Sequence, residues 1–305
     1  MKRNYFIIIF SVIVTMLLAS CGDGKSETEK QAAAEKAADS LALKIAVLPT
    51  LDCLPVYVAK ELSLFDKHDI DVRLKKYSAH MDCDTALTTG AVDGTFTDIV
   101  RVENLKARGV DCDVRNVTNI CWQLVTNKMA RINRLNQLEN KMIAMTRFSA
   151  THLLADTAMQ KGKLTDDKTF LVQINDVNLR LLMLRNNEMD ALLLPEPQAT
   201  LARLEGHKVL LDSRKLGMQL GALAFNNVKD STKNQQIDKF IEVYEQACDT
   251  INKYGFKKYR KLISDFCGID ESLVDSIPQD ISFVKGKNVR KEDAELATQW
   301  YKKNR

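Results

Sequence analysis

Several signatures that would place the protein in a functional class are absent from the sequence. Its 44 Lys and Arg residues nearly balance its 40 Asp and Glu residues, and it has no basic patch of the kind that binds nucleic acid. The region around Gly94 lacks the glycine and lysine spacing of a phosphate-binding loop. No G-x-S-x-G nucleophile elbow occurs either. The sequence therefore contains no recognisable catalytic constellation.

A hydrophobic run long enough to cross a membrane is also missing at the N-terminus. Residues 5–19 are almost continuously apolar and follow the basic Lys2 and Arg3, whereas a membrane span needs about 18 to 20 residues. Residues 18–21 read Leu-Ala-Ser-Cys, which resembles a bacterial lipobox. We expect residues 1–21 to be a lipoprotein signal peptide with Cys21 lipidated. The alternative is an ordinary secretory signal with an incidental cysteine.

The segment that follows has almost no large apolar side chains. Residues 22–42 are rich in Glu, Lys, Ala and Ser, so they cannot bury enough surface to fold alone, and we predict a flexible tether. Removing Lys2 and Arg3 with the signal lowers the formal net charge from +4 to +2. The rest of the 305 residues is long enough for one or two domains with real cores.

Cysteines are present in a number that permits disulfides. Apart from Cys21 there are six, an even count in a chain expected to be exported. Many connectivities are possible, and the pairing of nearest neighbours in sequence is Cys53–Cys83, Cys112–Cys121 and Cys248–Cys267.

Strand and helix patterns alternate from residue 43 onward. Strands are expected at 44–48, 71–77, 94–97, 113–120, 122–126, 142–145, 170–174, 190–194, 208–211 and 221–225. Helices are expected at 55–64, 83–90, 99–109, 132–139, from 149, 177–185, 197–204, 234–254, 256–266 and 291–303. This alternation predicts an α/β protein with two mainly parallel sheets, each flanked by helices. We expect residues 43–124 and 222–305 to form lobe one and residues 125–221 to form lobe two, with a cleft between them.

A set of short segments, taken in order, resembles a known family. The segments are residues 45–49 with 55–60, 64–65 with 70–72, 86–94, 149–151 and 192–197. Their order and spacing are similar to those of type II periplasmic solute-binding proteins. The nearest branch binds nitrate, aliphatic sulfonates, taurine and thiamine pyrimidine precursors. The resemblance covers roughly residues 43–227.

The resemblance implies a receptor of an ABC importer. Such a protein closes two lobes on a small molecule, works with the membrane subunits of the importer, and is a monomer without enzymatic activity or cofactor. A fungal enzyme of this branch uses a cysteine-rich motif, but this sequence has no run of clustered cysteines. Aspartates and cysteines near the expected cleft depart from the family pattern, so the class of ligand stays open.

The turn at residues 149–151 is a candidate ligand contact in lobe two. Ser149 precedes the apolar residues of a helix and is a good N-cap. The N–H groups of a helix N-terminus also bind anions, so Ser149 and Thr151 could hold a sulfonate, nitrate or carboxylate. The alternative is that Ser149 only caps the helix. Nearby, Arg147 is either an anion partner or a surface ion-pair member, and His152 is either a polar neighbour or a ligand contact.

Further candidates follow other strands. Asp52 and Cys53 follow the first strand, and Asp98 and Glu196 each follow another, so each is either a local cap or a residue of the cleft wall. Several converging aspartates would favour a cationic or amino-bearing ligand. Aromatic side chains either stack on such a ligand or belong to the core; they are Tyr57, Phe96 and Trp122.

Residues 80–84 combine His80, Asp82, Cys83 and Asp84. Asp82 either caps a short helix or reaches the cleft. A metal site formed by His80, Cys83, Cys53 and an aspartate is an alternative, although the spacing matches no closed zinc pattern. The sequence thus leaves three functions open: a solute receptor, a metal- or thiol-dependent protein using Cys53 and Cys83, or a sensor lipoprotein on the same fold.

Overall fold

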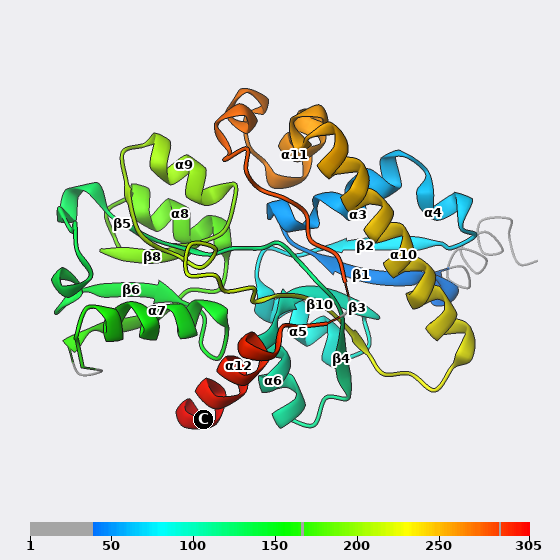
Figure 1. Ribbon diagram of the computed structural model, residues 1–305, viewed down its shortest axis with the longest axis horizontal. Helices are drawn as coiled ribbons and strands as arrows, with labels where there is room; N and C mark the ends of the chain where they lie inside the picture. The colour runs from blue at the N-terminus through cyan, green and yellow to red at the C-terminus, as the bar shows by residue number, and fades with distance from the viewer. Residues whose placement is uncertain (1–38, 166–167, 287) are drawn as a thin grey trace, which may run out of the picture. The chain divides into compact units, whose positions relative to one another are not determined.

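Two mixed five-stranded sheets organise the chain (Figure 1). The computed structural model describes residues 39–165, 168–286 and 288–305. The first sheet has the strand order β2-β1-β3-β10-β4, and its strands are β1 (Leu43–Val47), β2 (Val72–Lys76), β3 (Gly94–Asp98), β4 (Cys112–Val117) and β10 (Gly221–Asn226). The second has the order β7-β6-β8-β5-β9, with β5 (Gln123–Thr126), β6 (Met142–Met145), β7 (Phe170–Gln173), β8 (Ala191–Leu194) and β9 (Lys208–Asp212). We call each sheet with its helices lobe one and lobe two.

Helices cover both sheets. Those of lobe one are α3 (Leu54–Glu61), α4 (Leu64–Lys67), α5 (His80–Thr88), α6 (Ile99–Ala107), α10 (Ser231–Tyr254) and α11 (Arg260–Cys267). Those of lobe two are α7 (Ala150–Lys161), α8 (Val177–Arg185) and α9 (Gln198–Leu204), and α12 (Lys291–Asn304) ends the chain. Short 3-10 turns lie at Leu51–Cys53, Lys128–Ala130, Leu135–Leu138, Phe256–Tyr259 and Glu271–Ser276. Strand β8 consists of four apolar residues and is buried along its whole length, as expected for a strand covered on both faces. Helix α10 has apolar residues at helical spacing and buries that face against the core.

Each sheet is mixed, with four strands running in one direction and one strand running against them. β1 pairs in parallel with β2 and β3, and β6 pairs in parallel with β7 and β8. β10 and β5 are antiparallel to their neighbours. Both strands begin where the chain arrives from the other lobe, so each runs against the parallel strands. The strand expected at residues 122–126 is β5, which belongs to the second sheet.

The prediction of a helix at residues 132–139 is wrong. In its place the chain forms the 3-10 turn Leu135–Leu138. The Oε1 atom of Gln137 accepts hydrogen bonds from the backbone N–H groups of Asn133 and Arg134, at 2.8 and 3.0 Å. This side chain fixes a tight turn, because the backbone donors are satisfied without a longer helix.

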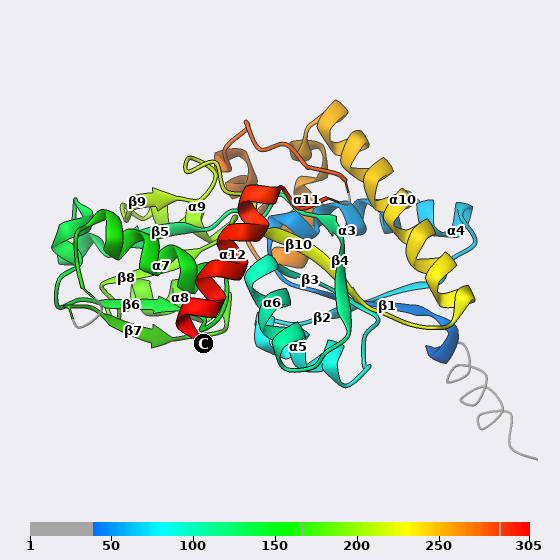
Figure 2. The same cartoon turned by 60° about the horizontal axis from the view of Figure 1, so that its bottom comes forward.

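The C-terminal helix α12 contacts both lobes (Figure 2). The hydroxyl of Tyr301 donates to Asn104 of α6 at 3.1 Å. The indole Nε1 of Trp300 donates to Asp156 of α7 at 2.7 Å. Helix α12 therefore joins a helix of lobe one to a helix of lobe two.

The expected disulfides are not formed. The six cysteines of the described residues are free and buried. Five of them, all except Cys121, pack in the hydrophobic cluster of lobe one, where a thiol behaves as a small apolar side chain. Burial raises the pKa of the Cys83 and Cys121 thiols to about 12, so both are protonated at neutral pH.

The predictions for the N-terminus lie outside the described residues. They comprise the signal peptide with Cys21 and the tether as far as residue 38. Among the helices that the structure describes, none combines the length and apolar character needed to span a bilayer.

Two segments carry the chain between the lobes, and they touch each other. Residues 118–122 lead from β4 to β5, and residues 213–220 lead from β9 to β10. The N–H of Thr118 donates to the carbonyl of Gly221 at 3.1 Å. A Cβ atom at Gly221 would lie 2.3 Å from Oγ1 of Thr118 and 2.5 Å from Cγ2 of Ile120. Only glycine permits this close approach.

We expect Gly221→Ala to lower the free energy of unfolding by about 1–3 kcal/mol, because the added methyl group overpacks this contact. Urea unfolding followed by circular dichroism measures the change. An unchanged unfolding midpoint would show that the two segments separate easily and that the contact does not constrain the backbone.

Candidate functional site

The loops that end the parallel strands of the two sheets meet face to face. Hydrogen bonds join them directly: Leu51 N to Glu196 O at 2.9 Å, Gln198 Nε2 to Pro49 O at 2.8 Å, and Val177 N to Ser78 O at 3.3 Å. Ala79 and Asp176 also form an isolated antiparallel bridge. The cleft expected between the lobes is therefore closed by contacts between protein groups.

The turn at the start of α7 lies in this contact. Ser149 is the N-cap, as predicted, and its Oγ accepts from the backbone N–H of Thr151 at 3.1 Å. The same hydroxyl donates to the carbonyl of Thr146 at 2.7 Å. Oγ1 of Thr151 accepts from the N–H of Thr146 at 2.9 Å. Both side chains are buried, and their hydroxyls are fully used in holding the turn.

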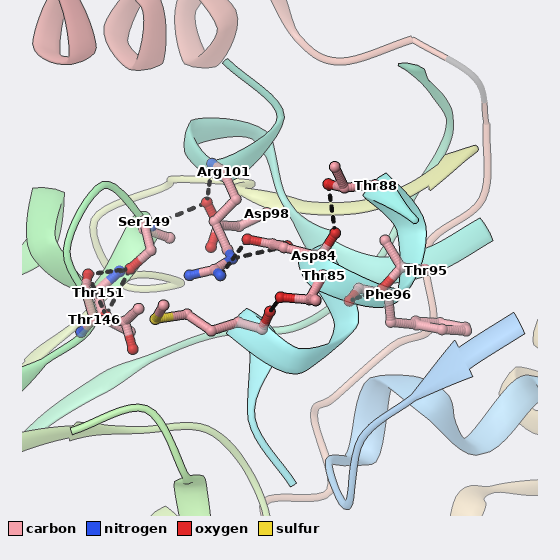
Figure 3. A network of polar contacts seen from close by, with 12 residues as sticks. Asp84, Thr85, Thr88, Thr95, Phe96, Asp98, Arg101, Thr146, Ser149 and Thr151 are labelled. Carbon is pink, nitrogen blue, oxygen red and sulfur yellow. Dashed lines mark hydrogen bonds and ion pairs between the residues drawn. The ribbon is translucent and has the colours of Figure 1, made fainter. Parts of the chain in front are cut away.

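Asp98 of lobe one reaches the same turn (Figure 3). It is the N-cap of α6, and its Oδ1 accepts from the backbone N–H of Arg101 at 2.9 Å. Oδ1 also accepts from the backbone N–H of Ala150, the first residue of α7, at 3.0 Å. One carboxylate thus serves the N-termini of two helices in different lobes.

Two buried guanidinium groups, those of Arg101 and Arg180, lie in the same contact. Arg101 forms a buried ion pair with Asp84. Arg180 donates to the carbonyls of Ile174 and Leu193 and to the hydroxyl of Thr146, at 2.7, 2.9 and 2.5 Å. Burial, with the nearby charge of Arg101, lowers the pKa of Arg180 to about 9. The same burial and the two guanidinium groups hold the pKa of His80 well below its usual range, so this ring is neutral.

The carboxyl of Asp98 titrates near neutral pH. Burial raises its pKa to about 7, although the charge of Arg101 and the two backbone hydrogen bonds oppose the shift. Asp52 behaves similarly, because burial raises its pKa to about 6. Both groups bind a proton more tightly in the folded chain than in the unfolded one.

A raised carboxyl pKa predicts the sign of the pH dependence. The folded state retains protons that the unfolded state has lost, so the stabilising contribution is full below about pH 4 and disappears as the pH rises through about 7. We therefore expect the melting temperature of the wild type, relative to Asp98→Asn, to fall between pH 5 and pH 8. Thermal melts of both proteins measure the difference, and a constant difference would contradict the shift.

Asp52 faces a small space between the lobes. Its Oδ2 accepts from the hydroxyl of Thr118 at 3.4 Å, while its Oδ1 has no hydrogen-bond partner among the described residues. The space measures about 10 Å³, and Asn119, Cys121 and Glu196 also line it. Other buried oxygens in or next to these loops have no partner among the described residues either; they belong to Thr97, Asn119, Asn175 and Gln198.

The side chain of Glu196 bonds to other residues of lobe two. Its Oε1 accepts from Gln123 Nε2 at 2.8 Å and pairs with Arg203 at 2.9 Å. Its Oε2 accepts from the N–H and the hydroxyl of Thr200, at 3.0 and 2.6 Å. This set of bonds favours a structural role over direct contact with a ligand.

We expect Glu196→Gln to lower the free energy of unfolding by about 1–3 kcal/mol, because the charge that pairs with Arg203 is lost and buried donors lose an acceptor. Urea unfolding measures the effect. The surface substitution Glu188→Gln in the same lobe is the control, expected to stay within about 0.5 kcal/mol of the wild type. Equal midpoints for the two variants would show that the Glu196 network adds nothing.

The remaining predicted residues lie elsewhere. Cys53 is fully buried in the core of lobe one, and Asp82 is exposed on α5. The ring of His152 lies edge-on to Trp300, with the ring centroids 4.8 Å apart. The aromatic candidates are core residues: Tyr57 stacks on Phe266, and Phe96 and Trp122 are almost fully buried. These positions favour packing over ligand contact.

Several residues of the site had no distinct signal in the sequence. Arg180 lies inside the apolar run of α8, where a buried cation is unusual, and this was the available clue. Arg101 follows the cap residue Asp98 by three positions. Asn119 and Gln198 meet Asp52 and Pro49 only because the lobes come together.

A larger hollow of about 440 Å³ opens beside the contact and is lined from both lobes. Its polar lining includes Arg101, Arg108, Arg147, Thr88 and Gln173. A second hollow of about 310 Å³ lies along the two crossing segments. Within the described parts of the chain, no group of three or more His, Cys, Asp or Glu side chains has the arrangement of a metal site.

Comparison with known sequences gives one family match. The sequence model of the family described as "NMT1/THI5 like" matches residues 50–254. No curated protein matches the chain in sequence.

Solved structures share the fold at low sequence identity. The alkanesulfonate-binding protein SsuA from Xanthomonas axonopodis pv. citri, bound to MOPS, has a TM-score of 0.72 and 15% identity over 85% of this chain and 90% of its own. The periplasmic aliphatic sulphonate-binding protein SsuA from Escherichia coli has a TM-score of 0.70 and 18% identity, covering 86% of each chain. The periplasmic nitrate-binding protein NrtA from Synechocystis PCC 6803 has a TM-score of 0.70 and 11% identity over 87% of this chain and 80% of its own. The predicted two-lobed α/β fold of periplasmic binding proteins is confirmed.

Proposed function

Because the chain belongs to the NMT1/THI5-like family, we propose that it is a solute-binding protein that captures a small polar molecule between its lobes for an ABC importer. The relatives in structure bind alkanesulfonates and nitrate. Their shared two-lobed fold supports capture between lobes, and the loops that meet here are those at the carboxyl ends of the parallel strands, where such sheets bind ligands.

The unpartnered oxygen of Asp52 is the observation that indicates the ligand. A buried acceptor without a partner costs about 1–3 kcal/mol, and a ligand that donates a hydrogen bond to it would remove that cost. The amide oxygen of Gln198 is also an acceptor, since its Nε2 already donates to Pro49 O. These acceptors favour an amino-bearing ligand, such as an aminopyrimidine of the thiamine-precursor type, over a sulfonate or nitrate.

The space at Asp52 is about the size of a single water. A ligand therefore enters only when the lobes separate and the hydrogen bonds between them break. Closure around the ligand would then re-form part of this contact, as in hinge proteins that close on their ligands.

A thiol- or metal-dependent function receives no support. Cys53 and Cys83 are fully buried, and burial raises the pKa of both thiols. A protonated, inaccessible thiol is a poor nucleophile and a poor metal ligand. The protein is a binding protein rather than an enzyme.

Placement at a membrane is the remaining part of the proposal. Lipidation of Cys21 would hold the protein in the bacterial cell envelope, on the periplasmic or outer side of a membrane, as a monomer beside the importer subunits. The lipobox-like residues 18–21 support this anchoring.

We expect one compound of a small panel to raise the melting temperature of the full-length chain, because a ligand at about 100 times its dissociation constant adds about 2.7 kcal/mol. The panel holds 4-amino-pyrimidines, taurine, alkanesulfonates and nitrate. Asp52→Asn should weaken the binding free energy of the stabilising compound by about 1–3 kcal/mol, measured by calorimetric titration.

The control for this substitution is Asp82→Asn, because Asp82 is exposed on α5 and outside the contact. It should leave the affinity unchanged. Stabilisation by nitrate or a sulfonate with unchanged affinity in Asp52→Asn would overturn the preference for an amino-bearing ligand.

A further inference from the structure

We propose that Asp98 determines specificity by occupying the anion-binding position at the N-terminus of α7, so that small anions are excluded from the cleft. The inference rests on the proposed function and names the class of solute that the site rejects. Without Asp98, a helix N-terminus that faces a cleft would favour an anionic group such as a sulfonate, nitrate or carboxylate.

The geometry of the contact carries the first part of the argument. Helix α7 has 12 residues, and its first N–H, that of Ala150, points at Oδ1 of Asp98 at 3.0 Å. The next N–H, that of Thr151, is already bonded to Ser149 Oγ. Asp98 therefore takes the donor that Ser149 leaves free, at the point where an anionic ligand would bind. Figure 3 shows Asp98 between Ser149 and Arg101.

The balance of buried charge carries the second part. Arg101, Arg180, Asp84 and Asp98 form one group of ionisable residues in this contact that are at least nine-tenths buried. Asp52 and Glu196 are also buried in the contact, and Glu196 pairs with Arg203. His80 is neutral there, and Asp176, which also acts on Arg180, is only half-buried. With Asp98 ionised, two negative charges balance two positive ones. Without it, a buried positive charge and a helix N-terminus would face the cleft together, and both favour an anion.

Competition by a free anion is unfavourable for a simple reason. Asp98 is part of the same chain and is already fixed as the N-cap of α6. Its effective concentration at Ala150 is therefore far above that of any dissolved anion, because closing the lobes delivers it without a loss of translational freedom. An anion would also add a third negative charge to the group formed by Arg101, Arg180, Asp84 and Asp98, which is neutral when Asp98 is ionised.

The test is the substitution Asp98→Ser in the full-length chain. Serine caps helices well and is shorter and neutral, so α6 keeps its cap while the N–H of Ala150 is released. We expect methanesulfonate and sulfate to bind Asp98→Ser at least about tenfold more tightly than the wild type in calorimetric titrations. The titrations are run near pH 8.5, where the wild-type carboxyl, with its pKa of about 7, is ionised.

Asp98→Asn is the matched control. Its side-chain oxygen can still cap α6 and accept from Ala150, so it fills the same space without the charge. It should bind anions less tightly than Asp98→Ser. If Asp98→Ser retains the wild-type circular dichroism and gains no anion affinity, or if the wild type binds methanesulfonate as tightly as this variant, the inference is wrong.

The two proposals fail in different ways. Failure of every compound in the panel to bind the wild type would overturn the proposed ligand class, while a gain of anion binding by Asp98→Ser would still support the role of Asp98. Conversely, an aminopyrimidine that binds both proteins equally, with no anion gain, would leave the solute receptor standing and remove the specificity role.

Discussion

The hydrogen bond between the Asp98 carboxylate and the first N–H of α7 is the constraint around which the site is arranged. It links a strand end of lobe one to a helix start of lobe two. It also requires the neighbouring cation Arg101, because an isolated carboxylate at this depth would be too costly to ionise. Asp84 forms an ion pair with Arg101 in turn. The closed contact is thus a small network in which each charge depends on the others.

Proteins described as binding alkanesulfonates or nitrate share this architecture. In this chain an internal carboxylate stands at the helix N-terminus, and the acceptor atoms left without partners lie nearer Asp52. The fold can therefore be shared while, under the proposal above, the preferred charge of the ligand differs. Selectivity in such a site depends as much on which ligands leave buried groups unpaired as on which ones bind well.

Local rules predicted the local features well. The caps at Ser149 and Asp98 follow from the residue type before an apolar helical pattern, and the structure confirms both. The helical pattern gave a wrong prediction for residues 132–139, where one glutamine side chain stabilises a turn instead. The bond from Ala150 to Asp98 was beyond sequence reasoning, because it joins residues 52 positions apart in different lobes. The same holds for Arg180, whose partners are carbonyls brought together by folding.

The strand order of the first sheet has a consequence for synthesis. β10 lies between β3 and β4, yet it is separated from β4 in sequence by the whole of lobe two. A nascent chain can complete the contiguous lobe two before the central position of the first sheet is filled. Lobe one, although it starts first, must then finish last, with the edge of β3 unpaired until residue 226 has arrived. Such an open edge is a site for mispairing, so the order of emergence favours holding the chain unfolded until its C-terminal part is available.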